Sequence, residues 1–440
     1  MCLDLPAYTR LDIHQREIYA LKLDGRFLIE GPPGTGKSVV ALHRAANYAR
    51  MDRAPTVIMA SKMLKLWTTK AIQVAAKEAK CSEEQIKKID VKTYDTWFPE
   101  WYQKTFKQEI PRKASEVNLK TFPQRFDGFC SECKQRTHRA VNLTYKAGGK
   151  WVTVHQACVD QVVARRTYME IDIEELEKIK NDLMTNCPPS IDKTLDIVID
   201  EGQDLPNVFY QLIHQFARSI TVYADGAQVI NEGLKKTLPE DIAQTLRIEP
   251  AHRLLLRKNY RNAQEVAQLA ETFRPRDFVP AELPTRMCTE PPEIIQFESY
   301  KETAVHIELI ANNFSNKSIG VFVTRTDERD QLANAFKENN FTNFQVYNKD
   351  DWRNPIDPCA KGVFIATNKV AKGLEFDVVI AAALESWPAI PKEEQDGVFY
   401  VLLSRSKDVL KLSYTGKDEP IFFTSDKYRD KINLIPRKTL

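Results

Sequence analysis

The sequence predicts an α/β chain with two parallel-sheet lobes and a small insertion in the first lobe. Short apolar, β-branched runs recur along the chain and alternate with stretches of helical character. Strands that are covered by helices on both faces are apolar throughout, so this alternation favours parallel sheets. The runs fall into two groups, one in each half of the chain, which predicts two lobes. They are residues 26–30, 56–60, 195–200 and 220–224, then 319–324, 363–367, 378–383 and 409–414.

The first lobe is expected to comprise residues 1–97 and 190–262, and the second to comprise residues 263–440. The insertion, residues 98–189, interrupts the first lobe; it is basic and aromatic, and it ends in an acidic stretch of helical character. Its residues 101–166 carry 13 Lys or Arg and 5 Asp or Glu, whereas the whole chain has a net charge of only +3. A basic segment in a slightly acidic body indicates a surface for a polyanion, although an ordinary solvated face is the alternative.

Composition excludes several classes of protein. The chain has 440 residues and is 43% hydrophobic and 28% charged, which is enough to build two or three domain cores. It begins with no signal peptide and contains no apolar run of about 18 residues, so we expect no membrane partner. Five cysteines stand alone, as reduced thiols do in cytoplasmic proteins, and we therefore expect a cytoplasmic location. They are Cys2, Cys81, Cys187, Cys288 and Cys359.

The most specific motif is the run GPPGTGKS, which follows an apolar run and precedes a helical pattern. That strand–loop–helix context is the one in which a phosphate-binding loop occurs. Glycines let backbone N–H groups close around phosphates, Lys37 is expected to reach the β- and γ-phosphates, and Ser38 to bind Mg²⁺. The sequence thus predicts a nucleoside triphosphate site. Its loop residues are Gly31, Pro32, Pro33, Gly34, Thr35, Gly36, Lys37 and Ser38.

A second motif, DEGQD, follows the predicted strand at 195–200. Adjacent acids at the end of a strand, downstream of a phosphate loop, are typical of the metal-and-water site of an NTPase. Asp200 is expected to hold the metal, and Glu201 is the candidate base that orients the attacking water. The alternative is a polar strand-to-helix turn in which Asp acts as a cap.

The order and the residue patterns of these motifs resemble those of the UvrD/Rep-like superfamily 1 (1A) DNA helicases. The resemblance covers nearly the whole chain except the insertion. The resemblance rests on LDxxQ at 11–15, the two motifs above, ADGAQ at 224–228, RKNYRN at 257–262, AKGLEF at 371–376 and YVLLSRS at 400–406. It implies two RecA-like lobes of a P-loop NTPase that uses ATP and Mg²⁺.

Roles follow from the same resemblance. Gln15 would read the adenine edge, Tyr260 would stack on adenine, and Gln228 would sense the γ-phosphate. Arg261 would contact the γ-phosphate, and Arg405 would act as an arginine finger from the second lobe. The ATP site would also include Gly373 and Glu375.

The resemblance also implies a single-stranded or partially duplex DNA partner. TYDTW at 93–97 is similar to a DNA-contacting loop of the family. The expected nucleic-acid residues are Ser61, Lys62, Thr93, Tyr94, Trp97, Thr367 and Lys369. The chain departs from the family in lacking an aromatic residue after Gln228, in having Met59 where an aromatic is common, and in having Lys369 in place of a histidine. Weaker base stacking is therefore expected, since each stacked base contributes roughly 1–3 kcal/mol.

Only about 20 residues separate the helical stretch 328–339 from the next predicted strand, which leaves no room for the family's 2B subdomain. The sequence thus predicts a reduced helicase or translocase that moves 3′→5′ on single-stranded DNA. A module gated by ATP inside a larger nucleic-acid-processing or defence complex is the alternative. RNA in place of DNA is a third possibility, because contacts to the phosphate backbone do not distinguish the two sugars.

The insertion contains two closely spaced ligand pairs, Cys130-x₂-Cys133 and His155-x₂-Cys158. Four such ligands suit tetrahedral Zn²⁺, and a β-hairpin predicted at 141–153 would bring the pairs together. His138 is a less well-spaced substitute ligand, and buried thiols beside a surface histidine are the alternative. A structural zinc knuckle with basic neighbours would offer a surface to nucleic acid or to a protein partner.

Overall fold

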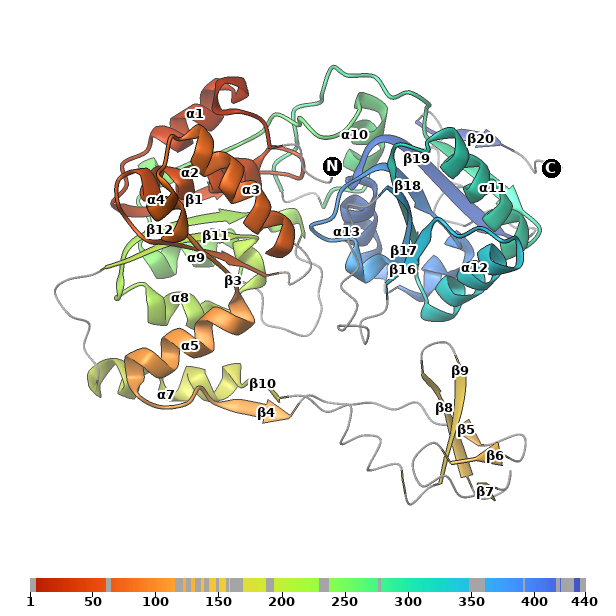
Figure 1. Cartoon of the computed structure of the whole chain (residues 1–440), viewed down its shortest axis with the longest axis horizontal. Coiled ribbons are helices and arrows are strands. Elements are labelled where there is room, and N and C mark those ends of the chain that lie inside the picture. The colour runs from red at the N-terminus through yellow and green to blue at the C-terminus, as the bar shows by residue number, and fades with distance from the viewer. Residues whose placement is uncertain are drawn as a thin grey trace. The chain divides into compact units, whose positions relative to one another are not determined.

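The computed structural model describes residues 5–60, 65–114, 122–123, 128–130, 136–137, 142–147, 150–155, 158, 169–186, 194–228, 237–275, 278–347, 361–390, 392–416, 420 and 431–435 (Figure 1). Contacts between residues divide the chain into two units. One consists of Met1–Glu100 together with Met184–Leu440, and the other of Trp101–Leu183. The larger unit contains two parallel sheets, so the predicted α/β class with two parallel-sheet lobes is correct.

The first sheet has six strands in the order β13-β1-β12-β11-β2-β3, and every neighbouring pair is parallel. Its strands are β1 (Gly25–Glu30), β2 (Pro55–Met59), β3 (Asp90–Thr93), β11 (Leu195–Asp200), β12 (Ala217–Ala224) and β13 (Arg253–Leu255). The three strands β1, β12 and β11 are neighbours. Because carboxyl ends of parallel strands share one edge, the segments that follow these strands converge.

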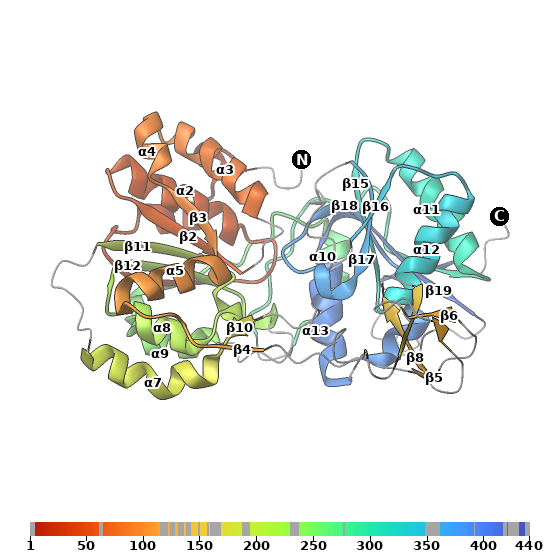
Figure 2. The ribbon, with the colours of Figure 1, turned by 60° about the horizontal axis from the view of Figure 1, so that its bottom comes forward.

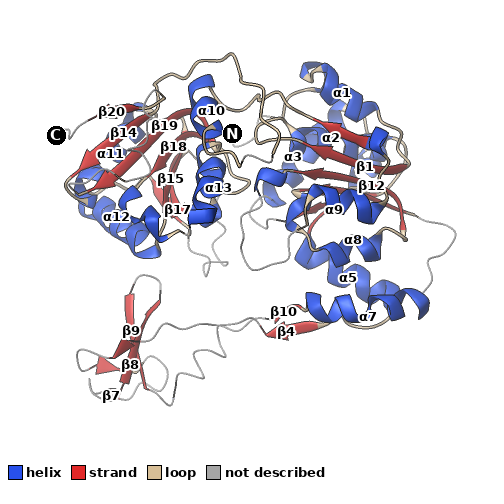
Figure 3. Ribbon diagram, turned by 180° about the vertical axis from the view of Figure 1, so that it is seen from behind, coloured by secondary structure: helices blue, strands red, loops and turns tan. Residues whose placement is uncertain are grey.

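Helices cover both faces of this sheet (Figures 1 and 3). Helices α2 and α3 lie on one face and α8 and α9 on the other. The helices of this part are α1 (Ile13–Ala20), α2 (Lys37–Arg50), α3 (Lys65–Glu78), α4 (Glu83–Lys87), α5 (Tyr94–Phe106), α8 (Asn207–Ile213) and α9 (Pro239–Leu246). On one face, Phe27, Ile29, Val57 and Val198 of the sheet are almost wholly buried in a shared apolar core.

The second sheet has seven strands in the order β16-β17-β15-β18-β19-β14-β20, again all parallel. They are β14 (Glu293–Phe297), β15 (Ser318–Val323), β16 (Phe344–Val346), β17 (Gly362–Thr367), β18 (Phe376–Ala381), β19 (Ser406–Thr415) and β20 (Asn433–Ile435). Helices α10 (Gln264–Glu271) and α13 (Lys392–Leu403) cover one face, and α11 (Tyr300–Asn313) and α12 (Thr326–Glu338) the other (Figure 2).

Strand β17 explains why the runs that were used to predict the sheets do not alternate between apolar and polar residues. Its Phe364 and Ala366 belong to the core beneath α10 and α13, whereas Val363 and Ile365 belong to the core beneath α11 and α12. Both faces are buried, so both sets of side chains are apolar. The sequence missed β3, β13, β14, β16 and β20, which are three to five residues long.

The smaller unit contains short antiparallel sheets. Strands β8 (Asn142–Ala147) and β9 (Lys150–His155) form the hairpin that was predicted, and β5 (Phe122–Pro123) adds to β8. Strand β6 (Gly128–Phe129) pairs with β7 (Arg136–Thr137), and β4 (Arg112–Ala114) pairs with β10 (Met169–Ile171). The acidic stretch forms α7 (Ile173–Asn186). Among the residues described, no helix combines the length and the apolar character needed to cross a bilayer.

Candidate active site

The glycine-rich run Gly31–Ser38 connects β1 to α2 at the carboxyl edge of the first sheet. Gly34 and Gly36 have φ values of +80° and +84°, a region that residues with a Cβ avoid. Gly36 directly precedes α2 as its N-cap, so the loop leads into the positive end of the helix. The local geometry is therefore that of a strand–loop–helix anion site.

Lys37 is the first residue of α2 and is buried, with 7% of its surface exposed. Its Nζ donates to the carbonyl oxygens of Gly31 at 2.6 Å and Pro32 at 3.0 Å, and lies 3.6 Å from Oδ2 of Asp225. Asp225 directly follows β12, the strand next to β1. In this structure the lysine charge is thus held by its own loop and by one buried carboxylate.

Two adjacent acids lie at the carboxyl end of β11, the other neighbour of β12: Asp200 is its last residue and Glu201 follows it. Burial, followed by the charge of Glu201, raises the pKa of Asp200 to about 6, while a hydrogen bond from Ser38 and the charge of Lys37 oppose the rise. Burial also pushes the pKa of Glu201 upward, but the cations Lys372 and Lys37 outweigh it and hold that pKa below its ordinary value. The two carboxyls therefore differ in proton affinity, which is the pattern of a site with divided roles.

The backbone at Glu201 is unusual, because this residue has φ +55° and ψ +45°. A residue with a Cβ pays a conformational cost there, and such strain clusters at functional positions. The side chain of Gln203 holds the carboxyl group of Glu201. Its Nε2 donates to Oε2 of Glu201 at 2.6 Å, and its Oε1 accepts from the backbone N–H of Asp225 at 3.0 Å. The loops after β11 and β12 are thereby fixed to each other.

Two arginines lie opposite these groups, around the cavity that is described below. Arg405 precedes β19 and is 1% exposed; its Nε donates to the carbonyl oxygen of Val401 at 2.8 Å. Burial, with the nearby charge of Arg261, lowers the pKa of Arg405 to about 10. Arg261 pairs with Glu375 through Nη2, while its buried Nε and Nη1 have no hydrogen-bond partner among the residues that the structure describes. Buried donors are usually satisfied, so these two nitrogens are candidates for contact with an acceptor on a ligand.

Lys37, Glu201, Arg261 and Arg405 line one cavity of about 610 Å³. Besides the predicted residues it is lined by Pro6, Arg10, Val39, Asp377 and Lys407. Of the predicted nucleotide residues, the cavity brings together Gln15, Pro33, Gly34, Thr35, Gly36, Lys37, Ser38, Glu201, Tyr260, Arg261, Glu375 and Arg405. Gly31, Pro32, Asp200 and Gly373 do not line it. Gln228 ends the short helix η4 (Gly226–Gln228), and its side chain lies outside the described part of the structure.

Gln15 and Tyr260 stand at the mouth of the loop. The Gln15 amide donates to the carbonyl oxygen of Thr35 at 3.1 Å, and its oxygen accepts from the backbone N–H of Asp12 at 3.2 Å. Tyr260 is 44% exposed, and its hydroxyl donates to Asp12. Its side chain is therefore accessible to solvent, and Nζ of Lys258 lies over the ring at 5.2 Å from the centroid.

Besides Arg10, Asp377 and Lys407, which line the cavity, three charged residues beside it were not singled out from the sequence. Asp225 faces Lys37, and Lys372 donates to Oδ1 of Asp204 at 2.7 Å, which joins the segment before β18 to the segment after β11. All three lie inside motif strings that the sequence did reveal, ADGAQ, AKGLEF and DEGQD. Their place inside these motifs could have marked them as site residues. Their interaction partners could not have been predicted, because those depend on the fold.

The predicted nucleic-acid residues belong to several elements, and part of them lie outside the described residues. Ser61 and Lys62 lie outside the described residues. The stretch expected to be a loop at 93–97 is the end of β3 and the start of α5, and Trp97 is 6% exposed and packs edge-on against Phe209 at 6.2 Å between ring centroids. Tyr94 packs against the same ring at 5.4 Å. Thr367 ends β17, and Lys369 lies in the short helix η6 (Asn368–Val370).

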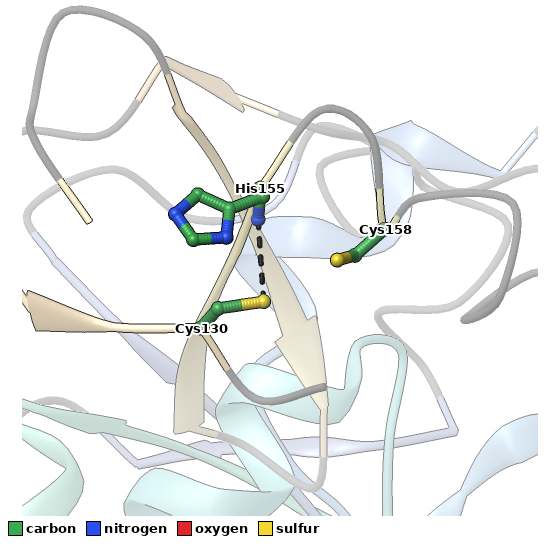
Figure 4. A group of neighbouring side chains, drawn as sticks. All are labelled: Cys130, His155 and Cys158. Carbon is green, nitrogen blue, oxygen red and sulfur yellow. Dashed lines mark hydrogen bonds between the residues drawn. The ribbon is translucent and has the colours of Figure 1, made fainter. Parts of the chain in front are cut away.

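The smaller unit holds a separate cluster of Cys130, His155 and Cys158 (Figure 4). One potential ligand atom from each lies within 4.8 Å of the others. His155 ends β9, and its backbone N–H donates to Sγ of Cys130 at 3.4 Å. Two sulfurs and an imidazole nitrogen this close suit a soft or borderline metal such as Zn²⁺. Cys133, the predicted fourth ligand, and His138, its substitute, lie outside the described residues.

No protein-family model and no curated protein matches this chain. Solved structures do match it, among them the crystal structure of the C-terminal domain of a possible DNA helicase from Lactobacillus plantarum WCFS1. That domain is 19% identical over the match, which covers 40% of this chain and 98% of the domain with a TM-score of 0.31. We therefore draw the function from the geometry of the site and from the motifs.

Proposed function

We propose that this chain binds ATP in the cavity described above, hydrolyses it, and uses the cycle to move along single-stranded DNA in the 3′→5′ direction. The observation that supports binding is the meeting of Lys37 with Arg261 and Arg405 around one cavity. Buried cations gain from an anion between them, and the unpartnered Nε and Nη1 of Arg261 are donors for phosphate oxygens.

A divalent cation would fit beside the first-sheet side of the cavity, which Ser38 lines and next to which Asp200 lies. Ser38 and Asp200 are hydrogen-bonded to each other, and hydroxyl and carboxylate oxygens are the donors that Mg²⁺ prefers. Bound there, Mg²⁺ would neutralise charge on the β- and γ-phosphates. A cation would also favour the ionised form of Asp200, whose pKa burial now raises.

The remaining roles belong to the chain itself. Glu201 stays ionised beside Lys372 and Lys37 and would accept a hydrogen bond from the attacking water. Lys37 would exchange its two carbonyl acceptors for phosphate oxygens. Arg405, already desolvated, would stabilise the negative charge that spreads over the γ-phosphate in the transition state. Since these groups come from both sheets, binding and hydrolysis would close and open the cavity.

The experiment that tests this function is a steady-state ATPase assay of the full chain, with and without single-stranded poly-dT. We expect hydrolysis that single-stranded DNA stimulates, together with strand separation of a duplex with a 3′ overhang. Poly-U in place of poly-dT distinguishes a DNA track from an RNA track. Absence of hydrolysis in every condition would contradict the proposal.

One observation favours a second candidate, an ATP-gated module whose output is a protein contact. Tyr94 and Trp97 pack against Phe209, so in this conformation they offer little surface to bases. This candidate predicts an ATPase that is insensitive to DNA. The same assay therefore separates the two, because only the motor requires stimulation by poly-dT.

We further propose that Cys130, Cys133, His155 and Cys158 bind one structural Zn²⁺. Three of these ligands already approach one another within 4.8 Å, and the hairpin β8–β9 delivers the histidine. A domain this small has little apolar core, so metal binding would supply much of its folding free energy. Elemental analysis of purified protein is expected to give about one zinc per chain.

A further inference from the structure

We propose that Asn262 is a positioning residue that fixes Arg405 in the catalytic cavity and, through Asn259, couples that arginine to the glycine-rich loop. The inference rests on the proposed hydrolysis of ATP, since it assigns a function to a residue that acts through Arg405. Asn262 is 1% exposed and does not line the cavity, so it would not touch the nucleotide itself.

The hydrogen bonds of Asn262 hold the backbone on both sides of Arg405. Its Nδ2 donates to the carbonyl oxygen of Ser404 at 3.0 Å and also to that of Ser406. The carbonyl oxygen of Arg405 accepts from the backbone N–H of Phe376 at 3.0 Å. Three successive carbonyls are thus bound, two of them by a single amide. Buried carbonyls need partners, so loss of this amide would release the segment that aims the guanidinium.

The other end of the Asn262 amide binds Asn259. Nδ2 of Asn259 donates to Oδ1 of Asn262 at 2.8 Å. Oδ1 of Asn259 accepts from the backbone N–H groups of Arg261 at 3.0 Å and Asn262 at 3.1 Å. Only one orientation of each amide satisfies all of these partners, because carbonyls accept and N–H groups donate. The two asparagines therefore form a directed chain of hydrogen bonds.

Asn259 in turn contacts the glycine-rich loop. A Cβ placed at Gly34 would lie 2.5 Å from Oδ1 of Asn259, so the missing side chain lets the amide pack on the loop. The backbone N–H of Tyr260 donates to the carbonyl oxygen of Gly34 at 2.8 Å. The chain of contacts thus runs from Gly34 through Asn259 and Asn262 to the residues that flank Arg405. A shift of the loop on nucleotide binding would be transmitted to the arginine through buried amides.

The test uses the full chain and compares Asn262→Ala, Asn262→Asp, Arg405→Ala and the double variant Asn262→Ala/Arg405→Ala. Asp keeps the size of Asn and the acceptor for Asn259 but lacks the donor. Asn47→Ala is the matched control, because Asn47 is also buried and its oxygen accepts from Arg50 on the same helix. Measured quantities are kcat and KM for ATP, the Kd for ADP, and the melting temperature.

We expect both Asn262 variants to lower kcat by about tenfold or more while the Kd for ADP changes by less than about twofold. The double variant should be no slower than Arg405→Ala alone, because the asparagine acts only through that arginine. Asn47→Ala should keep kcat even where it lowers the melting temperature. A purely structural role would instead lower ADP binding and stability and add to the loss from Arg405→Ala.

The outcomes separate this inference from the proposed function. If Arg405→Ala lowers kcat but Asn262→Asp and Asn262→Ala leave it unchanged, the positioning role is wrong and the hydrolytic function stands. If the double variant is further impaired in proportion to both single changes, the positioning role is also wrong. If the wild-type chain hydrolyses no ATP, both proposals are overturned together.

Discussion

The two sides of the cavity are built differently. On the first-sheet side, the loops after three adjacent strands bring Lys37, Asp225 and Glu201 together, so the lysine charge already faces carboxylates. On the other side, Arg405 is desolvated enough to lower its pKa to about 10, and Arg261 has two buried nitrogens without partners. The arginine side also holds an ion pair, between Arg261 and Glu375, so the contrast lies in the two Arg261 nitrogens that meet no hydrogen-bond acceptor among the described residues. Under the proposed function, we assign phosphate binding to the first-sheet side and stabilisation of the transition state to the arginine side.

The largest effect on ATP hydrolysis is expected from Lys37→Ala, which removes the lysine on the first-sheet side of the cavity. Hydrolysis should fall to background, with a loss of about a thousandfold or more, because Lys37 is the one cation of the loop Gly31–Ser38. A Kd for ATP measured by calorimetry should also rise. Lys70→Ala, which changes an exposed lysine of α3, is the control and should keep full turnover. Normal turnover by Lys37→Ala would remove the loop from the mechanism.

Glu201→Gln is expected to have the next largest effect on ATP hydrolysis. It should impair the chemical step while leaving ATP binding intact, although Glu201 and Lys37 lie on the same side of the cavity. The amide keeps the size of the side chain but cannot act as the base, so kcat should fall by about a hundredfold or more. The Kd for ATP and the circular dichroism spectrum should stay close to those of the wild type. Full-speed turnover by this variant would refute the role given to Glu201.

Lys372→Ala tests whether the charge of Lys372, from the second-sheet side, acts on Glu201 of the first-sheet side. The measurement is the pH dependence of kcat. Lys372 lowers the pKa of Glu201, so its removal should raise that pKa. A base works only when deprotonated, and activity is lost as the pH falls through its pKa. The acid limb of the kcat profile should therefore move to higher pH. Because Asp200 and Glu201 are adjacent, the limb reports the pair. An unmoved acid limb would show that Lys372 does not act on these carboxyls.

The smallest effect on hydrolysis is expected from the metal cluster, which belongs to the smaller unit. Cys158→Ser should reduce zinc content and expose the short sheets to proteolysis. ATP hydrolysis without DNA should change by less than about twofold, because none of the described residues that line the cavity belongs to this unit. A wild-type preparation without zinc would contradict the metal assignment directly, whatever its activity.

The features that could be predicted from the sequence are those formed by one continuous segment of the chain. The loop at Gly31–Ser38 and the hairpin Asn142–His155 are each one continuous segment, so composition and spacing predict them. Packing decides what the sequence left open. An aromatic at Trp97 could be a base-stacking surface or a core residue, and its contact with Phe209 is visible only in the fold. Asn262 has no signature of its own, because an amide gains a role only from the carbonyls that it meets.

In the proposed mechanism, a triphosphate is held between the two sides of the cavity, and the arginine side stabilises the transition state. The most direct test of this mechanism is the kcat for ATP of Arg405→Ala, measured beside the Kd for ADP. We expect kcat to fall by about a hundredfold or more while ADP binding changes less than about twofold. Wild-type turnover by this variant, or loss of ADP binding equal to the loss of turnover, would contradict the account.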